Sequence, residues 1–272
     1  MSFPPKTPAR FAPARTVGLI GFGAFGRLIA HHLAPHARLR AYDPVVAADA
    51  FGPDAEGVDL ATAAACPFVI LATPVPTLRT VARAIAPHLR PGALVADVGS
   101  VKVVPAAILR AELPAQVDIL ATHPLFGPQS ARDGIAGLTV AVCPVRGRRS
   151  LRAAAFLRRV LGLAVVVTTP EAHDREMAAV QGLTHLIAKV LVRMEPLPGR
   201  AGGRRMTTRS FERIMEAVDM VRHDAPEVFS AIERQNPFAP EVRRRFFALA
   251  AELEAELDAA DAPGAPRLAL VR

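Results

Sequence analysis

The chain has few cysteines and no long apolar run, and each shortage excludes a class of protein. Only Cys66 and Cys143 occur among the 272 residues, each beside a proline and a strand-like run. Two isolated cysteines provide neither a disulfide framework nor a metal cluster, so we expect two buried thiols. No apolar run approaches the roughly 18 residues that span a bilayer, and residues 1–14 lack the apolar core of a signal peptide. We therefore expect a cytoplasmic protein that does not enter a membrane.

Lysine is also scarce, although the formal net charge is +8. Lys6, Lys102 and Lys189 are the only lysines, so arginine supplies the rest of the positive charge in a chain rich in alanine and proline. The basic runs at 146–149 and 200–209 contain no interleaved aromatic residues for base stacking. This pattern indicates solvated arginines rather than a nucleic-acid surface.

The N-terminal part reads as an alternation of strands and helices. A short apolar strand at 16–20 leads into a glycine loop, a helix at 24–33 and a second strand at 37–42, which is the first unit of a doubly wound sheet. Continuous apolar runs, typical of strands covered on both faces, predict further strands at 67–71, 93–97, 117–121, 138–142 and 163–168. Helices are expected between several of them, notably at 77–87 and 150–161.

The pattern changes after Pro170, where the remaining chain reads as helices only. We expect them at 171–194, 211–221, 225–235 and 240–259, with Pro170 in the first turn of the first. The predicted fold is therefore α/β, with an N-terminal Rossmann-type doubly wound domain and a C-terminal all-helical domain. The expected divisions are a flexible arm at 1–15, a dinucleotide-binding domain at 16–169, a helical domain at 170–262 and a tail at 263–272.

The glycine loop predicts a dinucleotide site. It comprises Gly21, Phe22, Gly23, Ala24, Phe25 and Gly26. The first glycine suits a tight turn, the second lets a pyrophosphate approach the backbone, and the third permits close packing of helix on strand. Asp43 follows the second strand, where a carboxylate grips the ribose hydroxyls of NAD and repels the 2′-phosphate of NADP. The alternative for Asp43 is a turn residue before Pro44.

Three later strands end in polar residues that the topology brings to one edge of the sheet. Thr73 and Pro74 follow the first of these strands, Ser100 and Lys102 the second, and His123 the third. Imidazole is suited to take a hydroxyl proton near neutral pH, so His123 is the candidate acid/base group. Ser100 could bind a substrate hydroxyl or the nicotinamide; the alternatives are a helix cap at Ser100 and a surface Lys102.

The long helix after Pro170 carries a second group of polar residues. His173 and Asp174 lie near its start, where Asp174 could instead be a cap that favours the helix dipole. Gln181 and His185 are four residues apart and share a face with Thr184 beside them. Buried polar groups need partners, so these three could line a substrate pocket or bridge neighbouring helices.

Taken in order, these segments resemble the prephenate/arogenate dehydrogenases of tyrosine biosynthesis. The matching pieces are the glycine loop at 21–26, the segment Asp-Val-Gly-Ser-Val-Lys at 97–102, His-Pro-Leu-Phe-Gly-Pro at 123–128, and Glu-Ala-His-Asp-Arg at 171–175 leading into Gln-Gly-Leu-Thr-His at 181–185. The glycine loop is generic, whereas the order of the other segments is specific. The resemblance covers about 16–240.

The resemblance implies oxidative decarboxylation of a cyclohexadienyl dicarboxylate, with hydride transfer to NAD or, less favoured, NADP. His123 would polarise or deprotonate the ring hydroxyl, and Ser100 would hold that hydroxyl and the nicotinamide. Aromatisation would drive the reaction, so no metal is implied. Lys102, His173, Gln181, Thr184 and His185 would contact the substrate, and the helical domains would pair in a homodimer.

Two departures from the family pattern concern specificity. Ala188 replaces a second histidine of some members, and Ser230 replaces an arginine that holds the ring carboxylate in many prephenate-using members. Arg209, Arg213 or Arg234 could supply that charge. Gln181 and the segment at 235–238 resemble the plant arogenate enzymes, which favours arogenate slightly.

Two other functions fit parts of the pattern. A β-hydroxyacid dehydrogenase or an imine or pyrroline-carboxylate reductase would share the two-domain layout, with Lys189 as a catalytic lysine on the long helix. That alternative leaves Ser100 and His123 unexplained. A non-catalytic NAD sensor would have no reason to retain Ser100, His123, Gln181 and His185 together.

Overall fold

The computed structural model describes residues 16–194, 207–222 and 224–260. It divides into two compact units, the first ending at His173 and the second beginning at Asp174. The expected arm at 1–15 and tail at 263–272 lie outside the described residues. Within these residues, no helix combines the length and apolarity needed to cross a membrane. The cytoplasmic location stays a prediction.

The first unit is built on an eight-stranded sheet in the order β3-β2-β1-β4-β5-β6-β7-β8. The strands are β1 (Thr16–Ile20), β2 (Arg38–Tyr42), β3 (Glu56–Gly57), β4 (Phe68–Leu71), β5 (Leu94–Asp97), β6 (Asp118–Pro124), β7 (Thr139–Arg146) and β8 (Ala164–Val167). The order reverses between β1 and β4, which is the switch point where such sheets bind ligands beyond their carboxyl ends. The predicted doubly wound fold is confirmed.

One strand pair departs from a wholly parallel sheet. β7 runs antiparallel to β6, with His123 opposite Ala141, while β8 is parallel to β7. β6 is also longer than expected, because its pairing with β7 continues through His123 and Pro124. His123 therefore lies within a paired strand, which holds its backbone more firmly than a loop would.

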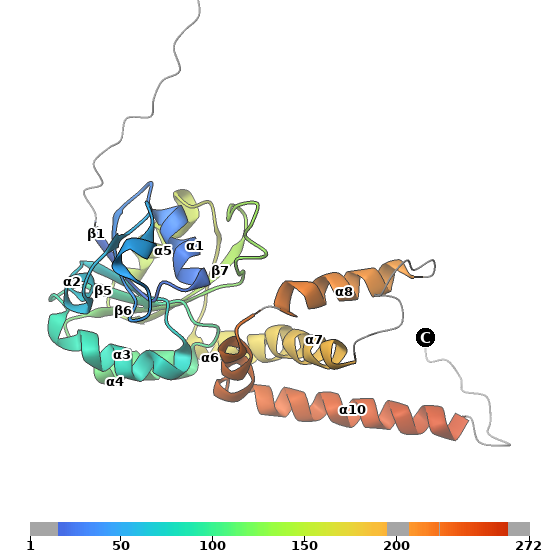
Figure 1. The fold of residues 1–272 in the computed structure, drawn as a ribbon. Coiled ribbons are helices and arrows are strands. Elements are labelled where there is room, and N and C mark those ends of the chain that lie inside the picture. Colours follow the sequence, from blue (N-terminus) through green and yellow to red (C-terminus); the bar gives the residue numbers. More distant parts are fainter. Residues whose placement is uncertain (1–15, 195–206, 223, 261–272) are drawn as a thin grey trace, which may run out of the picture. The chain divides into compact units, whose positions relative to one another are not determined.

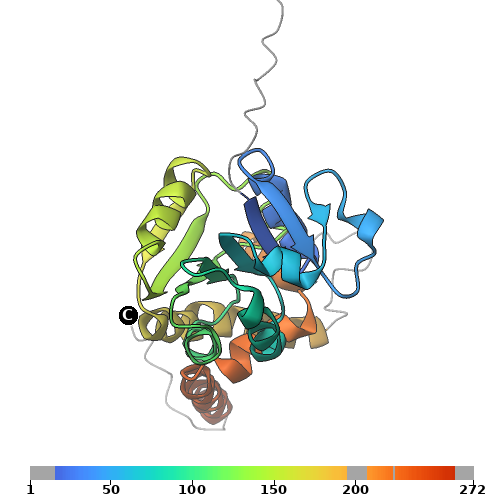
Figure 2. The same ribbon diagram turned by 90° about the vertical axis from the view of Figure 1, so that its left-hand side faces the viewer.

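Helices cover both faces of the sheet (Figures 1 and 2). On one face lie α2 (Leu60–Ala64), α3 (Leu78–Ile85) and α4 (Val103–Glu112); on the other lie α1 (Ala24–Leu33) and α5 (Ser150–Arg159). Short 3-10 turns are η1 (Ala48–Phe51), η2 (Val75–Thr77) and η3 (Ala86–His88). Alternate residues of a strand supply the two cores, as when Val69 and Leu71 pack under α3 while Ile70 packs under α1. Both cysteines are buried, as expected.

The second unit is helical throughout its described residues. α6 (Pro170–Met177) runs across the division between the units and is followed by the π-helical segment η4 (Ala178–Gly182) and α7 (Leu183–Arg193). α8 (Arg209–Arg222) packs on α7 around Met215 and Val218. Then come α9 (Pro226–Ser230), the π-helical segment η5 (Ala231–Gln235) and α10 (Ala239–Ala260).

The two π-helical segments correct the prediction of uninterrupted helices at 171–194 and 225–235. A π-helical turn inserts an extra residue, shifts the faces that follow and is frequent at functional sites. Both turns lie at packed positions: a Cβ on Gly182 would lie 3.5 Å from Oε1 of Glu233, which belongs to η5. The two π-helical turns therefore pack against each other. The spacing of apolar residues in the sequence does not indicate this contact, so the prediction missed the irregular turns.

Candidate functional site

The glycine loop between β1 and α1 has the geometry expected of a pyrophosphate cradle. Gly21 has φ +97°, and a Cβ there would lie 2.5 Å from the carbonyl oxygen of Ala72. A Cβ on Gly26 would lie 2.3 Å from the carbonyl oxygen of Gly21. A Cβ on Gly23 would meet no atom of the described residues within 4 Å, so the space above this residue is open to a ligand. Gly21 and Gly26 are thus required by the fold and Gly23 is not.

The start of α1 is suited to an anion. Gly23 is its N-cap and has no side chain, and the first turn has no acidic residue. The first N–H groups of the helix are therefore available to an anionic group, whose charge the helix dipole favours. Phe22 is buried against Phe51, and Phe25 lies beside Phe126, with ring centroids 6.3 Å apart. These contacts connect the loop to the core and to the segment that follows His123.

Asp43 directly follows β2 and binds the glycine loop. Its Oδ2 accepts a hydrogen bond from the N–H of Phe22 at 2.8 Å, and its Oδ1 accepts one from the N–H of Val45 at 3.0 Å. The expected turn interaction with the following residues is therefore present. A carboxylate has about four acceptor sites, so these two bonds leave capacity for ribose hydroxyls.

The polar residues expected at one edge lie at the carboxyl ends of the adjacent parallel strands β4, β5 and β6. Thr73 follows β4, and its buried Oγ1 has no hydrogen-bond partner within the described residues. Such a hydroxyl normally indicates an absent ligand or water. Ser100 is half-buried beyond β5, and His123 is 3% exposed in β6.

Lys102 does not lie at the surface. It is fully buried, and its Nζ donates to Oδ2 of Asp97 and, at 2.6 Å, to the carbonyl oxygen of Thr122. Burial raises the pKa of the Asp97 carboxyl, and the nearby charges of Lys102 and His173 oppose that rise. The surface alternative for Lys102 is thus excluded, and its contact with substrate stays a prediction.

His123 has a partner that the sequence did not indicate. Its Nδ1 lies 2.9 Å from Nε2 of His173, and both residues are 3% exposed. His173 is on α6 but belongs to the same unit as His123. The next residue, Asp174, is fully buried on the fifth position of α6, whereas the hydroxyl of Thr169 accepts from the N–H of Ala172 at the helix start. The capping role considered for Asp174 is therefore wrong, because Thr169 takes it.

In the second unit, His185 bridges two helical elements. Its Nδ1 lies 3.0 Å from the carbonyl oxygen of Gln181, and its Nε2 lies 3.2 Å from Oδ2 of Asp224, which follows α8. Both partners are acceptors, so a ring nitrogen that bonds to either of them is the donor. Thr184 is exposed and donates to the carbonyl oxygen of Val180. The bridging alternative therefore describes His185.

The arginines expected to bind a carboxylate differ in their surroundings. Arg209 is exposed at the start of α8, and Arg213 is exposed and pairs with Glu216 at 2.8 Å. Arg222, which the sequence analysis did not select, is half-buried at the end of α8 and pairs with Asp219 at 3.2 Å. It lines a small cavity of about 30 Å³ together with His185, Lys189 and Phe229. Its spacing of seven and four residues from buried Met215 and Val218 is the signal that could have identified it.

Two glutamine side chains leave buried acceptors without a partner within the described residues. These are Oε1 of Gln181, in η4, and Oε1 of Gln235, in η5. Asn236, by contrast, is satisfied: its Nδ2 donates to the carbonyl oxygen of Asp174 at 2.7 Å, and its Oδ1 accepts from the N–H of Phe238. Asn236 thus has a structural role, whereas the two glutamines remain available for a donor.

Sequence comparison assigns the chain to a family. A model described as prephenate dehydrogenase, nucleotide-binding domain, matches residues 42–195, and one described as prephenate dehydrogenase, dimerization domain, matches residues 169–268. The chain belongs to the prephenate dehydrogenase family. The resemblance inferred from its motifs is confirmed.

Named relatives of this prephenate dehydrogenase family member have three descriptions. Arogenate dehydrogenase 2, chloroplastic, of Arabidopsis thaliana is 30% identical over 257 residues, which are 88% of this chain and 69% of that protein. A 4-amino-4-deoxyprephenate dehydrogenase of Streptomyces pristinaespiralis is 31% identical over 85% of this chain and 80% of its own length. A probable arogenate/prephenate dehydrogenase of Methanocaldococcus jannaschii is 28% identical over 184 residues. The matched segment is 65% of this chain but only 41% of that protein's length.

Solved structures of the family share the fold. Prephenate dehydrogenase from A. aeolicus, in complex with hydroxyphenyl propionate and NAD+, superposes with a TM-score of 0.69 at 21% identity, covering 89% of this chain and 90% of that one. At this identity the likeness establishes the fold alone. Of the two departures from the family pattern, Ala188 is buried against Met215 and Val218, and Ser230 is half-buried at the end of α9.

Proposed function

We propose that this protein catalyses the oxidative decarboxylation of arogenate or prephenate, with NAD as the hydride acceptor. The observation that carries the proposal is His123, a buried imidazole at the carboxyl end of β6 in the same unit as an open glycine loop. The family and the names of the relatives support the substrate class. The product would be tyrosine from arogenate and 4-hydroxyphenylpyruvate from prephenate.

The proposed reaction requires one proton transfer by a residue of the chain. His123 takes the proton of the ring hydroxyl while a hydride leaves the carbon that carries it, and bound NAD supplies the acceptor for that hydride. The ring carboxylate leaves as carbon dioxide, its electron pair completes the aromatic ring, and His123 returns the proton to the phenolic oxygen. The substrate thus loses two electrons and carbon dioxide, and the protonation of the protein is unchanged. Ser100 would hold the hydroxyl and the nicotinamide in place.

The residues of the glycine loop support a dinucleotide. Gly23 leaves space for the pyrophosphate at the start of α1, and Thr73 and Pro74 lie at the end of the neighbouring β4. The hydroxyl of Thr73 has no partner among the described residues, and a bound nicotinamide nucleotide could supply one.

For the substrate side chain we favour the alanyl group of arogenate over the pyruvyl group of prephenate. An ammonium group is a donor of three hydrogen bonds, and a pyruvyl group has none to donate. The Oε1 atoms of Gln181 and Gln235, which have no partner in the described part of the chain, are acceptors that such a donor would satisfy. The relative named for 4-amino-4-deoxyprephenate adds a second candidate, in which an amino group replaces the ring hydroxyl.

The test is the formation of NADH, followed at 340 nm, with purified protein, NAD and each of the three candidate substrates in turn. Turnover of arogenate alone would support the proposal in full. Turnover of prephenate would mean that the side-chain assignment is wrong, and turnover of only the amino analogue would move the function to that substrate. NAD binding without turnover of any of the three would contradict the proposal and favour a sensor.

A reductase of the β-hydroxyacid or pyrroline-carboxylate type is a weaker alternative. It would need a catalytic lysine on the helix that contains Lys189, but the Nζ of Lys189 lies over the ring of Phe229, 5.6 Å from its centroid. That alternative also gives no role to the buried His123. Reduction of a 3-oxoacid or an imine by NADH or NADPH would support it.

We further propose that Arg222, rather than Arg209 or Arg213, binds a substrate carboxylate. Replacing Arg222 by Gln is expected to raise KM by roughly 10- to 100-fold with a smaller change in kcat, because a hydrogen bond to a charged group contributes about 1.5–3 kcal/mol. The matched control, Arg213→Gln, should leave KM unchanged, since that side chain is exposed and paired with Glu216. A rise in KM for the control alone would reverse the assignment.

Cofactor choice would depend on Asp43. The double substitution Asp43→Ser with Val45→Arg is expected to raise kcat/KM for NADP relative to NAD by roughly 10- to 100-fold, because it replaces a negative charge near the ribose by a positive one. Val45 is 89% exposed and can take a long side chain. Asp43→Asn is the control, since it removes the charge but keeps an acceptor for the N–H of Phe22. An unchanged preference in the double variant would mean that Asp43 does not contact the ribose.

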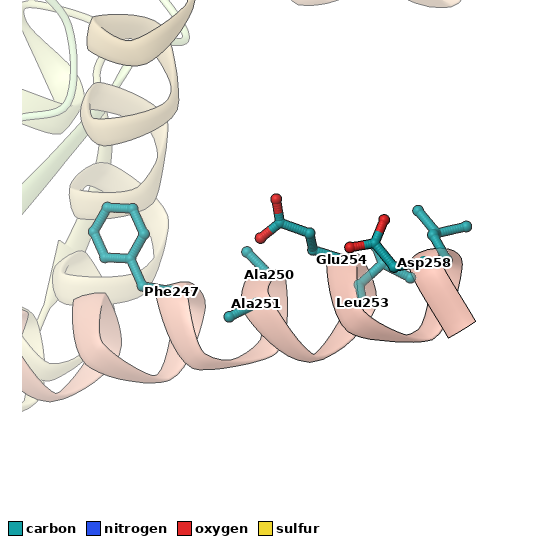
Figure 3. Close-up of a pocket in the computed structure, with 7 residues that line it drawn as sticks. Phe247, Ala250, Ala251, Leu253, Glu254 and Asp258 are labelled. Carbon is teal, nitrogen blue, oxygen red and sulfur yellow. The ribbon is translucent and has the colours of Figure 1, made fainter. Parts of the chain in front are cut away.

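We propose that the protein is a homodimer formed through a helical domain at 170–262. The second unit has an exposed, mostly apolar face along α10 (Figure 3). All its lining residues belong to this one helix: Phe247, Ala250, Ala251, Leu253, Glu254, Leu257 and Asp258. Leu253 and Leu257 are each 56% exposed. An apolar stripe of this kind favours contact with a second copy, and the match to a dimerization domain supports that partner.

Replacing Leu253 by Glu is therefore expected to produce a monomer. Burying one leucine contributes about 1.5–3 kcal/mol, and a twofold interface contains the residue twice, so the dimer should weaken by roughly 10²–10⁴-fold. Ala259→Glu is the control, because Ala259 is exposed and neither of the residues three and four positions before it lines this face. Sedimentation at matched protein concentrations would measure the change. A Leu253→Glu dimer as stable as the control would place the interface elsewhere.

A further inference from the structure

Four titratable side chains are buried together around His123 in the first unit. Asp97 is 2% exposed, Lys102 is fully buried, and His123 and His173 are each 3% exposed. Such a cluster is costly unless its members are paired, so its presence calls for an explanation. The proposed proton transfer uses only His123, and no step of it yet accounts for the burial of the other three.

The bond between the two histidines can run in either direction, and the direction decides what His123 can do. Nδ1 of His123 and Nε2 of His173 are 2.9 Å apart, so one nitrogen must donate and the other must accept. If His173 donates, a neutral His123 holds its proton on Nε2 and can only donate to the substrate. If His123 donates, its Nε2 has a lone pair and can accept the hydroxyl proton.

Asp97 favours the second direction. Its Oδ1 is buried and has no hydrogen-bond partner within the described residues. Burial raises the pKa of the Asp97 carboxyl, and positive charge on His173 is among the nearby charges that oppose this rise, so the two side chains lie close together. Nε2 of His173 faces His123, so a proton that the nearby carboxylate stabilises on the His173 ring would belong on Nδ1, which leaves Nε2 as the acceptor. Asp174, which follows His173 in the chain, is a further titratable residue and is fully buried.

Lys102 fixes the backbone next to His123. Its Nζ donates to the carboxylate of Asp97 and to the carbonyl oxygen of Thr122, the residue before His123. The hydroxyl of Thr122 donates to the carbonyl oxygen of Asp97 at 2.7 Å, so β5 and β6 are connected twice at this level. The ammonium also compensates the buried carboxylate. This placement gives Lys102, one of three lysines in the chain, a structural role at this position.

We propose that His173 is a positioning residue that accepts the hydrogen bond from Nδ1 of His123, and that the Asp97–Lys102 pair holds both rings in this arrangement. Nε2 of His123 is then the ring nitrogen that receives the substrate proton. When His123 is charged during the reaction, His173 shares that charge through the same bond. This inference rests on the proposed dehydrogenase function, but its structural core does not depend on turnover.

The first test uses nitrogen NMR of the histidine rings in the full-length protein labelled at the imidazole nitrogens. At a pH where both rings are neutral, His123 should have its proton on Nδ1 and a bare Nε2, and His173 should have a bare Nε2. The His36→Gln variant helps assignment, because His36 is exposed and lies outside the cluster. A proton on Nε2 of His123 would overturn the proposal. This result is independent of activity, so it separates failure of the positioning from failure of the proposed function.

The second test uses the pH dependence of kcat/KM with the substrate that turns over. In His173→Leu, kcat should fall by roughly 10- to 100-fold with KM unchanged, as expected when an orienting partner is lost. Loss of the hydrogen-bond acceptor disfavours the charged form of His123, which is inactive as a base. The acidic limb of the kcat/KM profile should therefore move to lower pH. Asp97→Asn should move the limb in the same direction, because it removes a negative charge while Asn can still accept from Lys102.

His173→Gln provides the rescue, because its amide oxygen can accept from Nδ1 of His123. It should recover at least a third of the logarithmic loss in kcat seen in His173→Leu. A rise in KM with unchanged kcat in His173→Leu would instead make His173 a substrate-binding residue. An unchanged acidic limb in both His173→Leu and Asp97→Asn would also contradict the proposal. Melting temperatures and NAD affinity of each variant identify any loss that comes from misfolding.

Discussion

Replacing His123 by Asn is expected to lower kcat by roughly 10²–10⁴-fold, the usual contribution of a positioned acid/base group. The imidazole is buried in a paired strand, bonded to His173 and beside Thr122, which Lys102 holds. The fold should tolerate the change, because Asn is smaller and its amide can still bond to His173. NAD affinity should be unchanged, since the glycine loop lies after β1, which is separated from β6 by β4 and β5.

The measurement is a set of initial rates for NADH formation, with NAD affinity obtained by calorimetry. His36→Asn is the matched control: it replaces an exposed histidine of the same unit and should retain full activity. Equal turnover by His123→Asn and the control would remove His123 from the mechanism. Loss of NAD binding together with activity would show that His123 supports the fold rather than the chemistry.

Alanine at Gly26 should lower stability, whereas alanine at Gly23 should lower NAD affinity and leave stability unchanged. At Gly26 the added Cβ would lie 2.3 Å from a backbone oxygen that cannot move without opening the turn. Overpacking of this kind costs about 1–3 kcal/mol, which corresponds to a fall in melting temperature of roughly 2–12 °C. At Gly23 the Cβ would meet no atom within 4 Å, so the melting temperature should not change. NAD affinity should nevertheless fall by roughly tenfold or more, because the pyrophosphate must approach that backbone.

Gly18→Ala separates the two effects. Gly18 lies in β1, away from the glycine loop. A Cβ added there would lie 2.0 Å from the carbonyl oxygen of Ala63. This variant should therefore lose stability as Gly26→Ala does, while any folded fraction binds NAD normally. If Gly23→Ala binds NAD as the wild type does, the dinucleotide does not lie against this loop.

Local signals were sufficient for most elements of the first unit. The strands β1, β2, β4 and β5 and the helix α1 lie within a residue or two of the predicted ranges, because buried parallel strands are short apolar runs between loops. The two-residue strand β3 was missed, since Glu56 and Gly57 carry no apolar pattern. The direction of β7 was also invisible, because an apolar strand has the same composition in either direction.

Some of the candidate residues could likewise be identified from the sequence, and others could not. Motif order identified the glycine loop, Ser100 and His123, because chain segments that end parallel strands meet at one edge of a sheet. Nothing local indicated that Nδ1 of His123 would face His173, fifty residues later, or that Arg222 would line the cavity beside His185. Such pairs depend on the distances between elements that are remote in the chain.

The sequence by itself determined the doubly wound fold, the family and the position of a histidine at the edge of the sheet. It did so because strand and helix periods and turn glycines act over a few residues. Only the tertiary structure decided that Lys102 is buried against Asp97 rather than exposed, and that Asp43 binds the glycine loop. The free energy of a charged side chain depends on which partners and how much solvent surround it, and those are properties of the packed molecule.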